Sequence, residues 1–226
     1  MKPLILFGTG KIAEVLLYFF RHHSDREVVA CTVDAAFIPG VEWEGLPVVP
    51  FDAVSQLYPP EQYDMFVAVG YHDMNALRAK KCAEARALGY TLASYIDAGS
   101  GVPQDLVHGD NCFVMNQALV HPRVVLGNNV FVWSGAMIGH HSTIGDNCWL
   151  TSCANISGVT TVGANCFFAV NSTVGHGVTL GDECFLGANA LVTKCSDRGA
   201  VFLVGNTAPF RLNSRQFLRM SNFSDI

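Results

Sequence analysis

The first residues of the chain whose types and spacing suit chemistry are two glycines in a tight turn. Gly8-Thr9-Gly10 follows the apolar run Pro3–Phe7 and precedes a stretch with apolar residues at helical spacing. Glycines let a backbone approach a phosphate closely, and a helix N-terminus favours negative charge. Asp34 closes the next apolar run, where a carboxylate can accept hydrogen bonds from a ribose or a base. The turn predicts a nucleotide-phosphate cradle; the alternative is a strand–helix turn that binds nothing.

Histidine is the second residue type that suits chemistry, because an imidazole can take up a proton near neutral pH. The chain holds eight histidines. His140 and His176 lie in the second half of the chain, and His141 directly follows His140. On residue type alone, either His140 or His176 could act as a general base.

The first hundred residues predict a small parallel sheet that positions the glycine turn. Short apolar runs alternate with segments of helical spacing, and the last expected strand is Thr91–Ile96. Gly70 and Tyr71 end one of these runs and are expected at the rim of the cradle, and Asp73 is expected to cap the next helix. A dinucleotide fold needs two βαβαβ halves, so too little chain precedes the change of pattern for a complete NAD site.

A six-residue repeat begins after Ser100. Apolar residues recur at every sixth position from Val102 to Val192, interrupted by His108, and the next residue is often glycine. Such a repeat indicates a solenoid. One inward side chain per six residues suits a narrow interior, so three hexads should close one triangular coil, and stacked coils should pair as strands do. His140 and His176 then share one corner, two coils apart.

Half of the eight cysteines fall on the small-residue position of this repeat. These four are Cys112, Cys148, Cys166 and Cys184. We expect them to point inward as small apolar side chains. The chain has no Cys-x-x-Cys pair, so zinc-site spacing is absent and no metal site is expected. Reduced thiols favour the cytoplasm.

Composition excludes several classes of protein. Of the 226 residues, 50% are hydrophobic and 15% are charged, which argues against a disordered chain. The net charge of −5 argues against a nucleic-acid partner. No apolar run is long enough to span a bilayer, and the start of the chain does not have the pattern of a secretory signal. We therefore expect a cytoplasmic globular protein.

The repeat resembles that of the hexapeptide-repeat acyltransferases, which wind into a left-handed parallel β-helix. With the α/β domain in front, the chain resembles the sialic acid O-acetyltransferase (NeuD-like) group. Within that group it is similar to the N-acetyltransferases that act on nucleotide-linked 4-amino sugars. The segments that carry the resemblance are Leu4–Ala13, Phe66–Arg78 and Val114–Arg211.

The resemblance implies three segments and an assembly. It implies a Rossmann-like nucleotide-sugar-binding domain over residues 1–98, a β-helix acyltransferase domain over 99–209 and a C-terminal arm over 210–226. It also implies a homotrimer with active sites between neighbouring β-helices.

The catalytic residues follow from the stretch Ile138–Gly145, which matches the family pattern I-x-H-E-x-x-I-G. The resemblance places His140 on the general base and leaves His176 as the alternative. His141 takes the place of an acidic residue that usually orients the base. A neutral imidazole would not raise the basicity of His140 as a carboxylate does.

The resemblance also implies two sets of binding residues. Acetyl-CoA is the implied co-substrate, held along a groove between two β-helices. Its implied contacts are Trp149 (a histidine in some members), Gly158, Val170, Ala188, Pro209 and Arg211. The residues implied for the nucleotide-linked sugar are Gly8, Thr9, Gly10, Asp34, Gly70 and Tyr71.

The activity implied is direct N-acetylation of the amino group of a nucleotide-linked amino-dideoxy sugar, without an acyl-enzyme. Two alternatives stay open: an O-acetyltransferase acting on sialic acid or another sugar hydroxyl, and a non-catalytic β-helix scaffold, because fold does not fix function. An NAD-dependent oxidoreductase would need a catalytic domain that a β-helix does not resemble. The nucleotide base, the sugar configuration and the acyl length are left open by the sequence.

Overall fold

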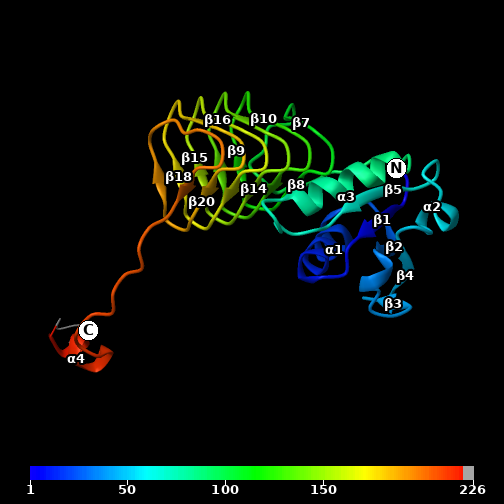
Figure 1. Ribbon diagram of the computed structural model, residues 1–226, viewed down its shortest axis with the longest axis horizontal. Coiled ribbons are helices and arrows are strands. Elements are labelled where there is room, and N and C mark those ends of the chain that lie inside the picture. Colours follow the sequence, from blue (N-terminus) through cyan, green and yellow to red (C-terminus); the bar gives the residue numbers. More distant parts are fainter. Residues whose placement is uncertain (221–226) are drawn as a thin grey trace.

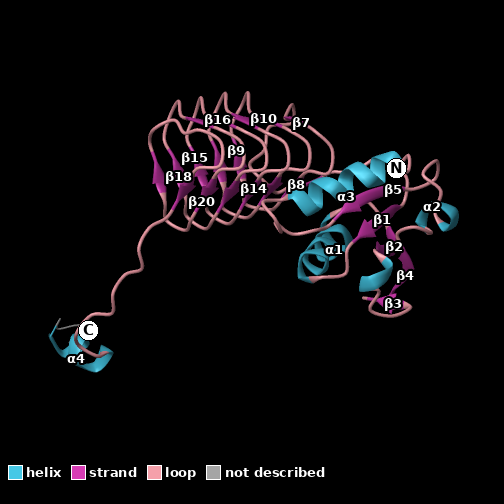
Figure 2. Ribbon diagram, in the orientation of Figure 1, coloured by secondary structure: helices cyan, strands magenta, loops and turns pink. Residues whose placement is uncertain are grey.

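Figure 1 shows an α/β domain, a coil of short strands and an extended arm in the computed structural model, which describes residues 1–220. The α/β domain lies at one end of the coil, and the arm leaves the other end. Figure 2 shows that the coil holds strands and turns, whereas the helices belong to the α/β domain and the end of the arm. Within the described residues, no helix is long and apolar enough to cross a membrane. The part of the expected arm at 221–226 lies outside these residues.

The N-terminal domain is built on one five-stranded sheet with the order β3-β4-β2-β1-β5. Its strands are β1 (Leu4–Phe7), β2 (Val28–Val33), β3 (Glu42–Trp43), β4 (Leu46–Pro50) and β5 (Asp64–Val67). β3 pairs antiparallel with β4, and the other pairs are parallel. β1 lies in the interior of the sheet, which explains why its residues are continuously apolar and buried.

Helices cover this sheet. They are α1 (Lys11–His23), the 3-10 turn η1 (Ala35–Phe37), α2 (Val54–Leu57) and α3 (Ala76–Ala87). The prediction that Asp73 caps α3 is wrong, because Asn75 is the N-cap and neither side chain makes a capping hydrogen bond there. Asp73, Met74 and Asn75 all have positive φ, so the chain makes a left-handed turn before the helix begins.

The coil has three faces, each a parallel sheet. The β10 face contains β7 (Val107–His108), β10 (Val125–Leu126), β13 (Thr143–Ile144), β16 (Thr161–Val162) and β19 (Thr179–Leu180). The β11 face contains β6 (Tyr95–Ile96), β8 (Phe113–Val114), β11 (Phe131–Val132), β14 (Trp149–Leu150), β17 (Phe167–Phe168), β20 (Phe185–Leu186) and β22 (Val201–Phe202). The β12 face contains β9 (Leu119–Val120), β12 (Met137–Ile138), β15 (Asn155–Ile156), β18 (Thr173–Val174) and β21 (Leu191–Val192). The arm ends in α4 (Ser214–Met220).

The register of the coil confirms the predicted left-handed β-helix of three hexads per turn. Phe131 pairs with Trp149, and Trp149 pairs with Phe167, so each strand meets the strand three hexads further on. The predicted strand Thr91–Ile96 is divided between the domains. Leu92 bridges to β5, whereas β6 pairs with β8 and begins the β11 face.

The corners of the coil repeat a left-handed residue. Every sixth residue from Asn111 to Asn189 has a positive φ, and many of these residues are Asn or Gly, which tolerate that conformation. Val159 is the one β-branched residue among these corner positions, with φ at 59°. A non-glycine residue in such a conformation costs of order 1–3 kcal/mol. Val159 is 48% exposed, so burial within this chain does not offset the cost.

The four cysteines predicted to point inward are fully buried in the coil. Each thiol lies within hydrogen-bond distance of a backbone carbonyl, as in the 3.1 Å contact from Cys148 Sγ to Gly163 O. The thiols therefore both fill the narrow interior and satisfy carbonyl groups that face into it.

The two domains are joined by a buried cation, Arg78 of α3. Its guanidinium donates to Oδ1 and the carbonyl of Asn129, to the carbonyl of Asn147, and to Asn75 and Gly70 within its own domain. Burial lowers the pKa of this guanidinium to about 10, which still leaves it charged at neutral pH. The cation therefore ties the loop after β5 to one corner of the coil.

Arg78 also packs against aromatic rings of the β11 face. Its guanidinium carbon lies 4.5 Å from the Phe131 ring centroid and 5.1 Å from that of Trp149. The faces of these rings attract a cation. The guanidinium meets them with its flat faces, which make no hydrogen bond.

Asparagines of the same corner extend the junction. The Asn111 side chain accepts from the Val67 N–H at 2.7 Å and donates to the Val67 carbonyl at 3.1 Å. Asn111 also donates to Asn129, which donates to Asn147. This asparagine corner, formed by Asn111, Asn129 and Asn147, continues the hydrogen bonding of β5 into the coil.

Replacing Arg78 by Met should lower the free energy of unfolding by about 3 kcal/mol, because buried acceptors on both domains lose their donor. Arg86→Met is the control. Arg86 also crosses to the coil, pairing with Asp110, but its side chain is 40% exposed, so its loss should cost under about 1 kcal/mol. Urea unfolding measures both changes. Equal effects of the two substitutions would contradict the role given to Arg78.

Stability should fall as the pH rises from 8 to 10. Burial raises the pKa of Cys31 and Cys82 to about 12 and that of Cys112 to about 11, from an ordinary value of 9.0. A group whose folded pKa is raised contributes stability that is complete below the unfolded pKa and is lost above it. Ionisation of each thiol in the unfolded chain should lower the free energy of unfolding by about 1 kcal/mol at pH 10. Urea titrations at pH 8 and pH 10 test this, and a flat profile would contradict it.

Candidate active site

The predicted base lies at an exposed corner of the coil between β12 and β13. His140 and His141 occupy this corner, and their side chains reach solvent. Their Nδ1 atoms are 3.1 Å apart, so one ring donates to the other and the tautomer decides which. If His140 donates, its Nε2 keeps a lone pair and is free to accept a proton.

His141 is in the left-handed conformation, with φ at 59°, and its imidazole has no fixed negative charge. It can hold the ring of His140 in one orientation through the Nδ1 contact. It cannot stabilise an imidazolium as a carboxylate partner does. Having His141 in place of the family's acidic residue therefore changes the electrostatics around His140 more than the position of its ring.

The two following coils bring Gly158 and His176 close to His140. Gly158 lies under its ring: a Cβ built at Gly158 would come 2.9 Å from both Cε1 and Nε2 of His140. One coil further, the His176 ring lies 6.4 Å from that of His140, centroid to centroid. The structure therefore brings His140, His141, Gly158 and His176 together, and we call this group the histidine corner.

The glycine turn lies between β1 and α1 as predicted. Gly8 has φ at 126°, and a Cβ there would come 2.8 Å from the Ala68 carbonyl oxygen, so only glycine fits. Gly10 is the N-cap of α1, and a Cβ there would meet nothing within 4 Å. Gly8 is thus required by packing, whereas Gly10 faces open space in front of the N-terminus of a helix, where an anion is favoured.

Asp34 follows β2 at the same edge of the sheet, next to the turn. Its Oδ1 accepts a 2.6 Å hydrogen bond from Lys81 Nζ, and Lys81 also binds Glu84. Burial opposes the charge on Lys81, but these two hydrogen bonds outweigh it and raise its pKa. Asp34 lines a cavity of about 390 Å³ with Phe51 and Asp52. Its second carboxylate oxygen has no hydrogen-bond partner among the described residues.

Gly70 and Tyr71 lie at the junction of the two domains. Gly70 is held by Arg78, and a Cβ at Gly70 would lie 3.5 Å from Ile12 of α1. Tyr71 is 52% exposed, and its ring packs against Trp149 and Phe167. Gly70 therefore borders the start of α1, whereas Tyr71 lies on the β11 face of the coil.

Trp149 lies in a different place from the one expected for a cofactor contact. It is 2% exposed, beneath Arg78 and Tyr71 on the β11 face, and stacks on Phe131. The N-terminal domain of its own chain covers this ring. Packing between the domains, and not an open groove, accounts for the tryptophan.

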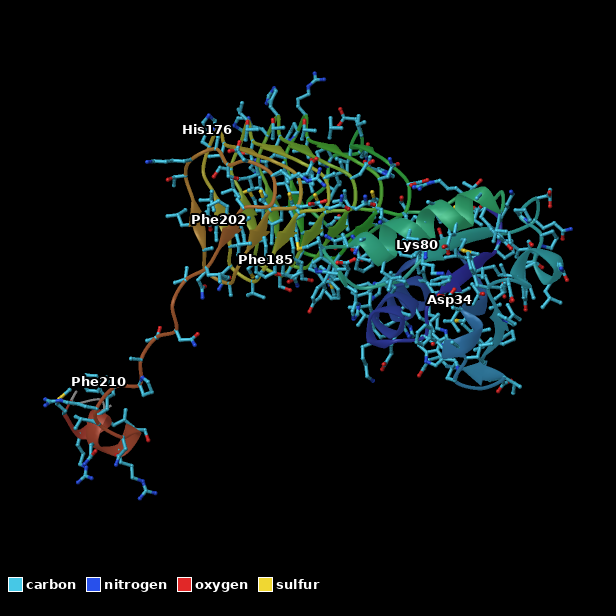
Figure 3. All side chains as sticks on the ribbon, in the orientation of Figure 1. Asp34, Lys80, His176, Phe185, Phe202 and Phe210 are labelled. Carbon is cyan, nitrogen blue, oxygen red and sulfur yellow. The ribbon has the colours of Figure 1, made fainter. Side chains whose placement is uncertain are left out.

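The other residues predicted for acetyl-CoA are spread along the coil and the arm. Val170 and Ala188 are exposed at the corner between the β11 and β12 faces. Ala188 lines a cavity of about 330 Å³ with residues 203–207, where the chain leaves the coil. Pro209 and Arg211 lie further out on the exposed arm, near the labelled Phe210 in Figure 3. The structure brings Ala188 and the start of the arm together, but not Arg211.

The histidine corner and the glycine turn lie on opposite sides of the chain. The N-terminal domain packs on the β11 face, and the histidine corner is the edge opposite that face. Figure 3 shows His176 at the outer edge of the coil and Asp34 in the distant N-terminal domain. A single chain therefore does not bring its own cradle to its own histidines.

Sequence reasoning missed Arg78 as the residue that holds the rim. A signal was present, because Arg78 shares the buried face of α3 with Cys82 and Ala85. A cation on a buried helix face needs partners, and those of Arg78 lie partly on the other domain. The strain at Val159 was also missed, since a valine in a hexad gives no sign of its φ angle.

Comparison with known families identifies the repeat. The family of bacterial transferase hexapeptide repeats (six repeats) matches residues 105–140 and 123–158. The hexapeptide repeat of succinyl-transferase matches residues 159–194. A search of curated proteins finds no match.

Solved structures extend the likeness to the N-terminal domain. PerB from Caulobacter crescentus, in complex with CoA and GDP-perosamine, is 25% identical, with 89% of this chain and 93% of that chain covered and a TM-score of 0.79. The acetyltransferase domain of PglB from Neisseria gonorrhoeae FA1090, in complex with acetyl coenzyme A, is 24% identical, with 88% and 95% covered and a TM-score of 0.78. WeeI from Acinetobacter baumannii AYE shares the fold at 13% identity, with 89% and 96% covered and a TM-score of 0.66.

The match to the repeat families and the shared architecture agree with the three-hexad register of the coil. Residues 105–194 carry the hexapeptide repeats of bacterial transferases, wound into a left-handed β-helix, and these matches support an acyltransferase.

Proposed function

We propose that the protein transfers an acetyl group from acetyl-CoA to the amino group of a nucleotide-linked amino sugar. The observation that carries the proposal is the presence of the histidine corner and the glycine turn in one chain. Both lie on a fold shared over 89% of the chain with PerB, which was solved with CoA and GDP-perosamine. A nucleotide-linked acceptor explains why a phosphate-type turn accompanies the acyltransferase repeat.

His140 is the general base of this reaction. The amine nitrogen attacks the thioester carbonyl carbon, and its proton passes to Nε2 of His140. The carbon–sulfur bond then breaks, the amide forms, and the proton goes on to the departing thiolate to give free CoA. His141 keeps the His140 ring in place through the 3.1 Å contact between their Nδ1 atoms. No bond to the protein forms at any step.

The acetyl-CoA site is expected beside the histidine corner and along the coil toward Ala188. Gly158 has no side chain, which lets the His140 ring lie over its backbone while the ring still reaches solvent. Val170 and Ala188 offer small or apolar surface, and the cavity where the arm begins offers space at the far end. Trp149 is left out of this site because its own chain covers it.

The acceptor is expected in the cradle, with its diphosphate at Gly8, Thr9 and Gly10 and its nucleoside near Asp34. The histidine corner lies opposite the face that carries this cradle. We therefore expect the sugar to reach His140 of a second copy. A closed ring of copies satisfies this need for every site, and we propose a homotrimer.

His140→Ala should lower kcat by about 10²- to 10⁴-fold, the usual contribution of a general base. Release of the CoA thiol with acetyl-CoA and GDP-, UDP- or dTDP-linked 4-amino sugars measures it. His22→Ala is the control, because His22 is an exposed histidine of α1. If His176→Ala abolishes turnover while His140→Ala does not, the base is His176. If the wild type turns over none of these sugars, the proposed function is wrong.

Gly10→Glu should raise KM for the nucleotide sugar at least about tenfold, because it puts a negative charge where the diphosphate binds. A Cβ at Gly10 has open space, so the fold should be kept. KM for acetyl-CoA should not change. Gly40→Glu adds the same charge elsewhere in the domain and is the control. An unchanged sugar KM in Gly10→Glu would place the acceptor outside the cradle.

Co-expression of His140→Ala and Gly10→Glu chains with different tags should restore activity. If each site joins a cradle and a histidine corner from two copies, random mixing leaves about a quarter of the sites intact. At sugar concentrations well below KM, the purified mixed assembly should then show about a quarter of the wild-type rate, more than either parent shows there. No recovery would mean that cradle and base act within one chain.

A further inference from the structure

Val159 stands out at the histidine corner by its conformation and its exposure. It follows Gly158, and its N–H donates a 2.8 Å hydrogen bond to the carbonyl of His140. Its φ is 59°, in the left-handed region that a β-branched side chain avoids. An asparagine or a glycine would take this conformation with less strain, as at many equivalent corners of the coil.

Nothing in the fold of the chain requires valine there. The side chain is 48% exposed, so it does not fill the core. Its corner equivalents in the neighbouring coils are His141 before it and Gly177 after it, and a Cβ at Gly177 would meet nothing within 4 Å. Val159 therefore borders open space on one side and the histidine pair on the other. A strained residue that the core does not need points to function.

The apolar character of Val159 suits one part of the proposed reaction. The other side chains of the histidine corner are imidazoles, which suit the amine and the thioester polar atoms. The methyl end of an acyl group needs an apolar contact, and it must lie next to the carbonyl carbon that the amine attacks. An isopropyl group one residue from Gly158 offers that contact.

We propose that Val159 contacts the acyl group of the thioester donor and restricts it to a short chain. The inference rests on the proposed function, because it takes the histidine corner as the place of transfer. It adds a specificity residue that selects acetyl over longer acyl groups. The strained backbone is kept because a smaller or polar side chain would weaken that selection.

Two substitutions separate strain from selection. Val159→Asn relieves the strain and should raise Tm by about 2–4 °C. It should also lower kcat/KM for acetyl-CoA about tenfold, because a polar group replaces the apolar contact. Val159→Gly removes the side chain and should raise the ratio of kcat/KM for butyryl-CoA to that for acetyl-CoA about tenfold.

Gln117 provides matched controls. It is an exposed residue with φ at 61°, seven hexads before Val159 and therefore at a different corner of the coil. Gln117→Asn and Gln117→Gly should leave kcat/KM and the acyl ratio unchanged. If Val159→Asn and Val159→Gly also leave them unchanged, the proposal is wrong. The proposal is also wrong if the loss of activity comes from a changed assembly, which light scattering would detect.

Equilibrium binding keeps this test independent of the sugar. Calorimetry with acetyl-CoA and butyryl-CoA needs no acceptor, so it reads selection even if no tested sugar is a substrate. The wild type should bind acetyl-CoA more tightly than butyryl-CoA, and Val159→Gly should remove most of the difference. Discrimination without sugar turnover would refute the proposed acceptor and support Val159. Equal binding of both donors by the wild type would refute the role of Val159.

Discussion

The burial of one guanidinium between two domains is the constraint on which the arrangement of the site depends. Arg78 can remain charged there only because carbonyl and amide oxygens from both domains surround it. Those acceptors belong to the rim of the cradle on one side and to the asparagine corner on the other. The same group that offsets its own desolvation therefore sets how the α/β domain lies on the coil. Once that orientation is set, the β11 face carries the α/β domain and the histidine corner is the edge opposite that face.

The coil could be predicted from the sequence because its period is set by local geometry. A six-residue repeat, kept over many turns, leaves one arrangement of three faces, and even the inward thiols follow from it. The junction could not be predicted in the same way. Thr91–Ile96 is apolar enough for either sheet, and Trp149 occupies a hexad position that is exposed or covered according to what packs on that face. Both outcomes depend on contacts distant in the sequence.

The candidate site shows the same division. His140 and His176 could be placed on one corner from spacing alone, and the two rings do lie there. The spacing does not reveal backbone angles, so the left-handed valine beside them had no signal. Nor does it reveal which face the α/β domain covers, and therefore that cradle and base of one chain point apart. Residue type and period predict where side chains lie along a coil, whereas strain and domain docking need coordinates.

The coil has no intrinsic length, because every turn offers the next one the same row of backbone donors and acceptors. At its start, β6 and the α/β domain cover that row. At its end, β22 is the last strand of the β11 face, and the chain then leaves the coil as the arm instead of beginning another turn. An uncovered row of this kind is a template for end-to-end growth of fibres. The departure of the arm ends the repeat but leaves the outer row of β22 open to pairing with another segment.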